Sequence, residues 1–174
     1  MTQDIKNIQT PVHVLIELEF SFVNVLLKNM QGQEVGNFRY PINNDIYSAA
    51  FEPLKTLDIR SARAFVWPKM SALVPNEFYT ESHKAQFLEK LYSGVDKTLV
   101  KTDHLDTINA THVFGIPPNQ QLALLTLFPG IKIQSTITSY LQYILDVSNH
   151  KNAVFSHQLS DRVWIVIILS LIHI

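Results

Sequence analysis

The chain has 174 residues, a formal net charge of −1, 47% hydrophobic and 17% charged residues, and no cysteine. This length and apolar content suffice for a well-buried domain and exclude a disordered chain. The near-neutral charge offers no basic surface for nucleic acid, and the lack of cysteine excludes disulfides, thiolate metal sites and thiol nucleophiles. Residues 1–10 have no apolar core and no stretch is long enough to span a membrane, so we expect a soluble, cytoplasmic protein without a signal peptide.

The first 40 residues predict a three-stranded antiparallel meander. Its strands are Val12–Phe20, Phe22–Lys28 and Glu34–Tyr40, and Gln31–Gln33 supplies the second turn. Alternation along the first strand places Glu17 and Glu19 on one face. The opposite, apolar face of that strand consists of Val14, Ile16, Leu18 and Phe20.

Helices and short strands alternate in the rest of the chain. Asn43–Asp45 offers N-cap side chains for a helix toward Leu57, in which Pro53 either causes a kink or starts a second short helix. Three later helices are predicted at Thr80–Tyr92, Pro118–Phe128 and from Ser135 or Thr136 to Leu145, the last with the clearest amphipathic spacing. The expected strands are Ala62–Trp67, Ala72–Pro75, Lys97–Thr102, Ala110–Ile116, Ile131–Ile133, Ala153–Phe155 and Val163–Ile168.

This order predicts an α/β protein with a mixed sheet, in which parallel strands with crossover helices follow the meander. We expect residues 1–149 to form this domain and residues 150–168 to begin a second domain that needs the rest of its own chain for packing. Leu169–Ile174 matches a translation of the transposon end used in sequencing libraries, which predicts an adapter-derived end on a truncated gene. A genuine buried C-terminal strand is the alternative.

The segment Ser71–Tyr79, which contains Leu73-Val74-Pro75, resembles the Leu-Val-Pro signature of the bacterial family called domain of unknown function 3822. The stretch Asp103–Leu105, the strand His112–Pro117 and the helix end Leu127–Pro129 follow in the order of that family. The family resembles the actin-like ATPases, whose fold has two ribonuclease-H-like halves, and its members are longer than this chain. The resemblance therefore implies that the chain holds the first ribonuclease-H-like domain of a duplicated actin-like fold.

Actin-like ATPases bind phosphate at a turn between their first two strands, of the form Asp-x-Gly-x-x-x-x-Lys/Arg. In this chain Glu17 takes the Asp position, Glu19 the Gly position and Asn24 the cationic position, and only Ser21 is compatible with phosphate. A carboxylate repels phosphate, and a side chain at the Gly position blocks the close approach of the backbone. The resemblance thus implies a vestigial phosphate turn, and we expect no nucleotide or other cofactor to bind.

The nuclease version of the same fold needs a cluster of carboxylates that holds two metal ions. Glu17 or Glu19 from the first strand and Glu52 from the first helix are the candidates. The fourth strand ends at Trp67-Pro68, where the third carboxylate is expected, and the chain lacks a basic surface for a phosphodiester backbone. We therefore expect no metal site, and we expect the glutamates to be solvent-facing.

Three other segments carry residue types found in sites. Asp103–Asp106 favours a turn or a helix cap over a metal site, because its side chains point in different directions. Trp67 and Trp164 lie on predicted strands and are expected in the core. Phe78–Tyr79 follows an extended proline segment and is either core or an exposed docking edge.

The sequence thus favours a non-enzymatic scaffold or interaction module of the actin-like fold, with an unidentified protein partner and neither nucleic acid nor metal. Two alternatives are open. One is a divergent actin-like ATPase whose site depends on a C-terminal half beyond this chain, and the other is a metal-dependent nuclease.

Overall fold

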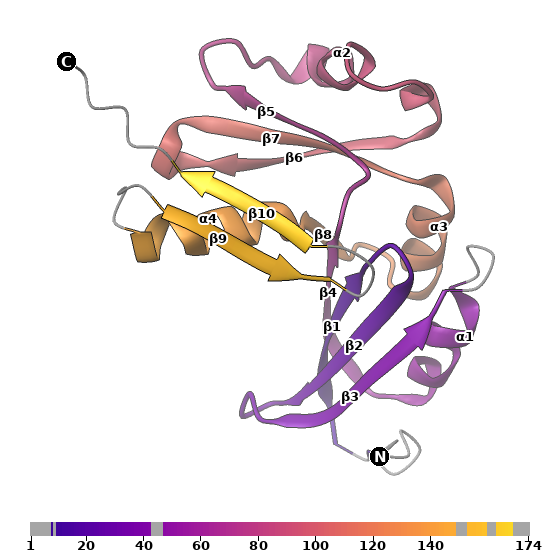
Figure 1. The fold of residues 1–174 in the computed structure, drawn as a ribbon. Helices are drawn as coiled ribbons and strands as arrows, with labels where there is room; N and C mark the ends of the chain where they lie inside the picture. The colour runs from indigo at the N-terminus through magenta and orange to yellow at the C-terminus, as the bar shows by residue number, and fades with distance from the viewer. Residues whose placement is uncertain (1–7, 9, 43–46, 149–152, 160–162, 169–174) are drawn as a thin grey trace.

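The computed structural model describes residues 8, 10–42, 47–148, 153–159 and 163–168 (Figure 1). The predicted N-cap at Asn43–Asp45, the predicted domain boundary after Asn149 and the predicted adapter segment Leu169–Ile174 lie outside the described residues. Among the helices of the described part, none is long and apolar enough to cross a membrane.

The largest sheet among the described residues has five strands and is mixed. Its strand order is β3-β2-β1-β4-β8, with β1 antiparallel to β2, β2 antiparallel to β3, and β1, β4 and β8 parallel. The predicted meander followed by parallel strands is therefore confirmed for this sheet. The strands are β1 (Val12–Leu18), β2 (Phe22–Asn29), β3 (Glu34–Pro41), β4 (Ile59–Val66) and β8 (Lys132–Ser135).

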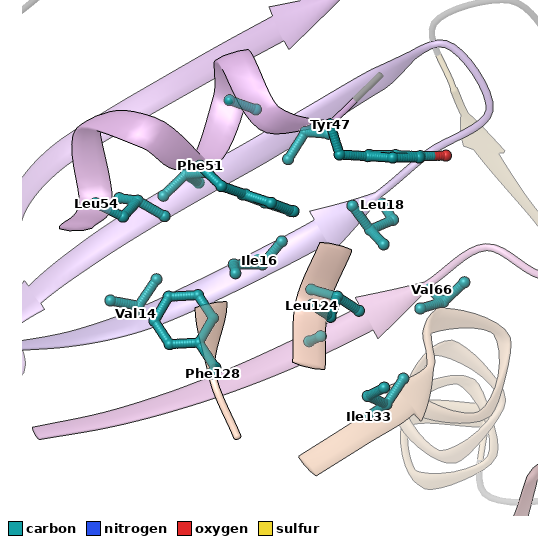
Figure 2. Close-up of a cluster of buried hydrophobic side chains, with 14 of the residues drawn as sticks. Val14, Ile16, Leu18, Tyr47, Phe51, Leu54, Val66, Leu124, Phe128 and Ile133 are labelled. Carbon is teal, nitrogen blue, oxygen red and sulfur yellow. The ribbon is translucent and has the colours of Figure 1, made fainter. Parts of the chain in front are cut away.

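One face of this sheet carries the main hydrophobic core. Side chains alternate across β1, so that Ile16 and its neighbours two residues away are fully buried beneath α1 (Ser48–Phe51), the 3₁₀ helix η2 (Glu52–Thr56) and α3 (Pro118–Leu127) (Figure 2). Pro53 lies in the first turn of η2, which confirms the second short helix rather than a kink. Burial of each large apolar side chain stabilises the fold by about 1.5–3 kcal/mol before entropy is counted.

A second, three-stranded sheet corrects the expectation of a simple alternation of strands and helices. It consists of β5 (Met70–Pro75), β6 (Leu99–Leu105) and β7 (Ala110–Ile116), in the order β5-β7-β6, and all of its pairs are antiparallel. Only the 3₁₀ turn η5 (Asp106–Ile108) and Asn109 connect β6 to β7. This connection is too short for the crossover that a parallel pair requires, so the two strands must form a hairpin.

The strand β7 contributes side chains to both hydrophobic cores, and all seven of its residues are buried. Val113 packs against Leu88 of α2 (Lys84–Glu89), in a small core that belongs to the second sheet. Phe114 and Ile116 belong to the main core. The 3₁₀ helix η3 (Glu81–His83) precedes α2 where the sequence predicts one longer helix over Thr80–Tyr92, and a further 3₁₀ helix, η4 (Val95–Lys97), follows Gly94.

The described chain ends with α4 (Thr136–Ser148) and an antiparallel hairpin of β9 (Ala153–Gln158) and β10 (Val163–Ile168). Figure 1 shows the hairpin alongside α4, and the Tyr140 hydroxyl of α4 lies 2.8 Å from Nδ1 of His157 in β9. The helix begins where the sequence predicts, because Ser135 Oγ accepts a hydrogen bond of 3.1 Å from the backbone N–H of Ile137.

Candidate functional site

The β1–β2 turn is tight, and backbone hydrogen bonds join it both across the turn and to the residue after β3. The N–H of Glu19 donates to the carbonyl of Phe22 at 2.9 Å, which leaves Phe20 and Ser21 as the two central residues. The Ser21 carbonyl accepts from the N–H of Ile42 at 2.8 Å, so the turn is also fastened to the end of β3. This geometry places the side chains of the predicted phosphate turn at the ends of β1 and β2.

Asn24 connects the two glutamates of this turn. It lies opposite Glu17 in the β1–β2 register, and its Nδ2 donates to Glu17 Oε2 at 3.1 Å and to Glu19 Oε1 at 2.6 Å. Since one amide nitrogen carries two hydrogens, it can serve both carboxylates at once. The residue at the expected cationic position therefore acts as a neutral donor between two acids.

Glu19 is only 7% exposed, which corrects the expectation that both glutamates face solvent. Its Oε2 lies 3.7 Å from Nη2 of Arg39 on β3. The Arg39 guanidinium stacks 4.1 Å above the ring of Phe22 and stays half exposed. A buried carboxylate needs such a partner, because desolvation of an unpaired charge is costly.

Arg39 is the functional residue that the sequence reasoning missed. Its signal lies in the pairing of β2 with β3, where Arg39 faces Asn24 across the two strands. Inspection of the phosphate pattern along the chain gives no reason to look at the third strand. We call Glu17, Glu19, Asn24 and Arg39 the turn cluster.

Trp67 connects the turn cluster to an aromatic cluster. Its backbone N–H continues the β1–β4 pairing by donating to the Leu18 carbonyl, and its Nε1 donates to Glu17 Oε1 at 2.9 Å. Trp67 is 3% exposed, as predicted for a core residue, whereas Trp164 is half-buried. Rings of Tyr140, His157 and Trp164 lie 5.7, 5.5 and 5.6 Å from the Trp67 ring. Burial raises the pKa of Tyr140, and the negative charge of Glu17 raises it further.

The carboxylates proposed for a nuclease are not brought together. Glu52 is exposed on η2, where it pairs with Lys55 at 2.6 Å, and η2 covers the face of the sheet that carries Ile16. Glu17 is next to Ile16 on β1 and therefore points to the opposite face. Within the described residues, no group of three or more His, Cys, Asp or Glu side chains could hold a metal ion.

Asp103 of β6 binds the last residue of β8, directly before α4. Its Oδ2 accepts from the backbone N–H of Ser135 at 2.8 Å, at the start of α4. Burial raises the pKa of Asp103, although this backbone hydrogen bond opposes the rise.

The cross-strand partner of Asp103 is His112, which is 2% exposed and shares a hydrogen bond of 2.7 Å with Thr138. Burial lowers the pKa of His112 from 6.5 to about 4.

The two aromatic residues after Pro75 have different environments. Phe78 is 66% exposed, whereas the Tyr79 ring stacks on Phe87 and meets the edge of His104. The Tyr79 hydroxyl also donates to Glu81. Tyr79 therefore has the predicted packing role, and Phe78 lies on the surface.

Solved structures resemble this fold, whereas no curated protein sequence matches the chain. A protein of Bacteroides thetaiotaomicron VPI-5482, described as having an actin-like ATPase fold and unknown function, is 15% identical, with a TM-score of 0.78 over 98% of this chain and 69% of its own. The cytoplasmic domain of EpsL, an inner membrane component of the type II secretion system of Vibrio cholerae, is 11% identical, with a TM-score of 0.53 over 91% of this chain and 68% of its own. At these identities the likeness shows the fold alone, a mixed α/β fold like that of the actin-like ATPases.

A family model supplies the sequence relationship. The model of the protein family of unknown function DUF3822 matches residues 49–169, which include the Leu73-Val74-Pro75 segment of β5 and the whole second sheet. The match covers most of the chain and agrees with the fold of the solved neighbours. The chain therefore belongs to the DUF3822 family.

Proposed function

We propose that this protein is a non-enzymatic interaction module of the actin-like fold, with a phosphate turn that no longer takes nucleotide. We also propose that the sheet β3-β2-β1-β4-β8 is a ribonuclease-H-like half of that fold, since a meander followed by parallel strands is its arrangement. The observation that carries the proposal is the buried Glu19 carboxylate at the position where an actin-like phosphate turn has glycine.

Electrostatics opposes phosphate at this turn. Two unit charges 4 Å apart near a protein surface interact by about 4 kcal/mol, and Glu19 would face several phosphate charges. Arg39 lies close to the turn, but Glu19 already uses it as its cationic partner. A phosphate that recruited Arg39 would leave the buried Glu19 carboxylate without that partner, which adds a desolvation cost.

The backbone of the turn supports the same conclusion. Phosphate turns bind their ligand through backbone N–H groups that point outward. Here the N–H of Glu19 is used within the turn by the Phe22 carbonyl. The position therefore lacks the glycine, and the N–H of Glu19 is not free for a nucleotide phosphate.

An interaction role fits the fold without a nucleotide. The EpsL domain is described as part of a secretion system, and by analogy of fold we infer that this protein also binds a protein partner. We infer a cytoplasmic location from the lack of cysteine, which suits a reducing compartment. Both inferences are separate from the chemistry of the turn.

Calorimetry with ATP and magnesium tests the proposal. We expect no saturable heat with the native protein, and micromolar binding would contradict the blocked turn. The matched variant is the double substitution Glu19→Gly with Asn24→Lys, which restores the glycine and the cation of the pattern. A gain of ATP binding in this variant would show that these two side chains are what excludes nucleotide, while circular dichroism verifies that both proteins are folded.

The position of Arg39 favours a second candidate, a divergent actin-like ATPase, because a cation does lie beside the turn. Affinity capture of the partner in the presence and absence of ATP separates the two candidates. An interaction module retains its partner in buffer with chelator and no nucleotide. Capture that requires ATP and magnesium, and that is lost in Arg39→Gln, would favour the ATPase.

A further inference from the structure

A groove of about 400 Å³ lies on the face of the five-stranded sheet opposite the main core. Polar side chains from three neighbouring strands reach it, namely Glu17 of β1, Asn24 of β2 and Asn37 of β3. Its apolar walls come from Leu15, Leu26 and Phe65. This combination of apolar walls with a few converging polar groups is typical of a binding site.

Glu17 gives the groove a negative charge that lacks a cation. Its two carboxylate oxygens accept hydrogen bonds from the neutral Asn24 amide and the neutral Trp67 indole. None of the ion pairs among the described residues includes Glu17, whereas the neighbouring Glu19 pairs with Arg39. A half-buried carboxylate with neutral donors gains stability from a cation that approaches its free lone pairs.

We propose that this groove receives an arginine side chain of the protein partner, with the guanidinium on Glu17. Each Glu17 oxygen accepts one hydrogen bond from the protein and can accept another, so both oxygens are available to the two parallel N–H groups of a guanidinium. The Phe65 ring offers a surface on which a planar guanidinium can stack.

The shape of the groove favours a side chain of a protein over a free small molecule. The groove is open along the sheet rather than enclosed, while sites for small ligands usually bury most of the ligand surface. Leu15 and Leu26 can cover the methylene stem of an arginine and the apolar residues beside it. The inference rests on the proposed interaction role and names the chemistry of the partner at this face.

NMR titration of the full chain tests the inference, with the indole N–H of Trp67 as the reporter because it donates to Glu17. The probe is the capped peptide acetyl-Leu-Arg-Leu-amide, and its control is the same peptide with citrulline, which has the shape of arginine without the charge. We expect a saturable shift of the Trp67 signal with the arginine peptide and at least about tenfold weaker binding of the citrulline peptide, since a charge-assisted hydrogen bond contributes roughly 1.5–3 kcal/mol.

Two variants test whether Glu17 is the group that binds the arginine peptide. Glu17→Gln retains an oxygen for the Trp67 N–H but removes the charge, so we expect the arginine peptide to bind it at least about tenfold more weakly. Glu34→Gln removes an exposed carboxylate at the start of β3, outside the groove lining, and should leave the affinity unchanged. Equal binding of the arginine and citrulline peptides, or no saturable shift in the folded native protein, would overturn the inference.

A third probe, n-butylguanidinium, distinguishes the source of the cation. Binding of this small molecule as tightly as the peptide would overturn the assignment to a protein partner and indicate a site for free organic cations. These titrations contain no nucleotide, so their failure refutes only the groove, whereas ATP binding refutes the proposed function of the turn.

Discussion

The buried His112 should make the protein less stable in acid. It is 2% exposed, stacks on Phe114 and shares its hydrogen bond with the Thr138 hydroxyl, so the folded protein accommodates the neutral ring and resists a charge there. Burial lowers its folded-state pKa from 6.5 to about 4. Below pH 6.5 the unfolded chain binds a proton at this residue that the folded protein does not bind.

Proton linkage gives the sign and the size of this change in the free energy of unfolding. The unfolded state binds more protons between the two pKa values, so the free energy of unfolding falls as the pH falls from 6.5 to about 4. At 1.36 kcal/mol for each unit between the pKa values, the loss is about 3 kcal/mol at pH 4. Asp103 opposes it, because its raised pKa lets the folded protein bind a proton more readily than the unfolded chain.

Urea unfolding followed by circular dichroism, at pH 7 and pH 4, measures the effect in the native protein and in His112→Gln. We expect the loss of stability between the two pH values to be smaller in the variant by about 3 kcal/mol. The same comparison is repeated with Asp103→Asn added to both proteins, which removes the opposing carboxyl. The variant His83→Gln is the control for the loss of an exposed histidine. An equal loss in the native protein and His112→Gln would refute the reasoning, whatever the stability at pH 7.

Three further predictions, the first with a matched control, concern core packing and helix capping. Leu124→Ala in the main core should lower the free energy of unfolding by about 2–5 kcal/mol, whereas Leu122→Ala, at a position 69% exposed, should change it by less than about 1 kcal/mol, as urea unfolding will measure. In Gly36→Ala the new Cβ would lie 2.6 Å from a ring carbon of Phe38, so we expect a loss of about 1–3 kcal/mol, and native stability in that variant would contradict this crowding. Ser135→Ala removes the hydroxyl that caps α4 and should cost about 1 kcal/mol, which would appear as a lower midpoint in thermal unfolding.

Local patterns in the sequence were sufficient to predict most of the strands and helices. Strict alternation along β1 predicts which face is buried, and the register of the meander follows from it. Pro53 predicts a break in the first helix, as a kink or as the start of η2, and Ser135 or Thr136 predicts the start of α4, because each residue type has a short-range chemical role at a helix start. These predictions depend only on residues a few positions apart.

The features that the sequence did not predict depend on pairing between strands that are far apart in the chain. The strands β5 and β7 were found in the sequence, but their separation into a second sheet depends on pairing over some forty residues, for which short apolar runs carry no signal. The burial of Glu19 depends in the same way on β3, because Arg39 and the stacked Phe22 ring approach it only when three strands are assembled. Alternation predicts the direction of a side chain but not what covers it.

The spacing of Glu17 and Glu19 brings these two acids together, and their remaining partners then distinguish them. Residues two apart on a strand point to the same side, so the two carboxylates approach each other and need a shared donor. Asn24 is this shared donor, and the remaining partners differ. Glu19 forms an ion pair with Arg39, whereas Glu17 accepts a hydrogen bond from the Trp67 indole. Glu19 is thereby paired with a cation within the protein, while the hydrogen-bond donors of Glu17 are neutral and Glu17 lines the wall of a groove.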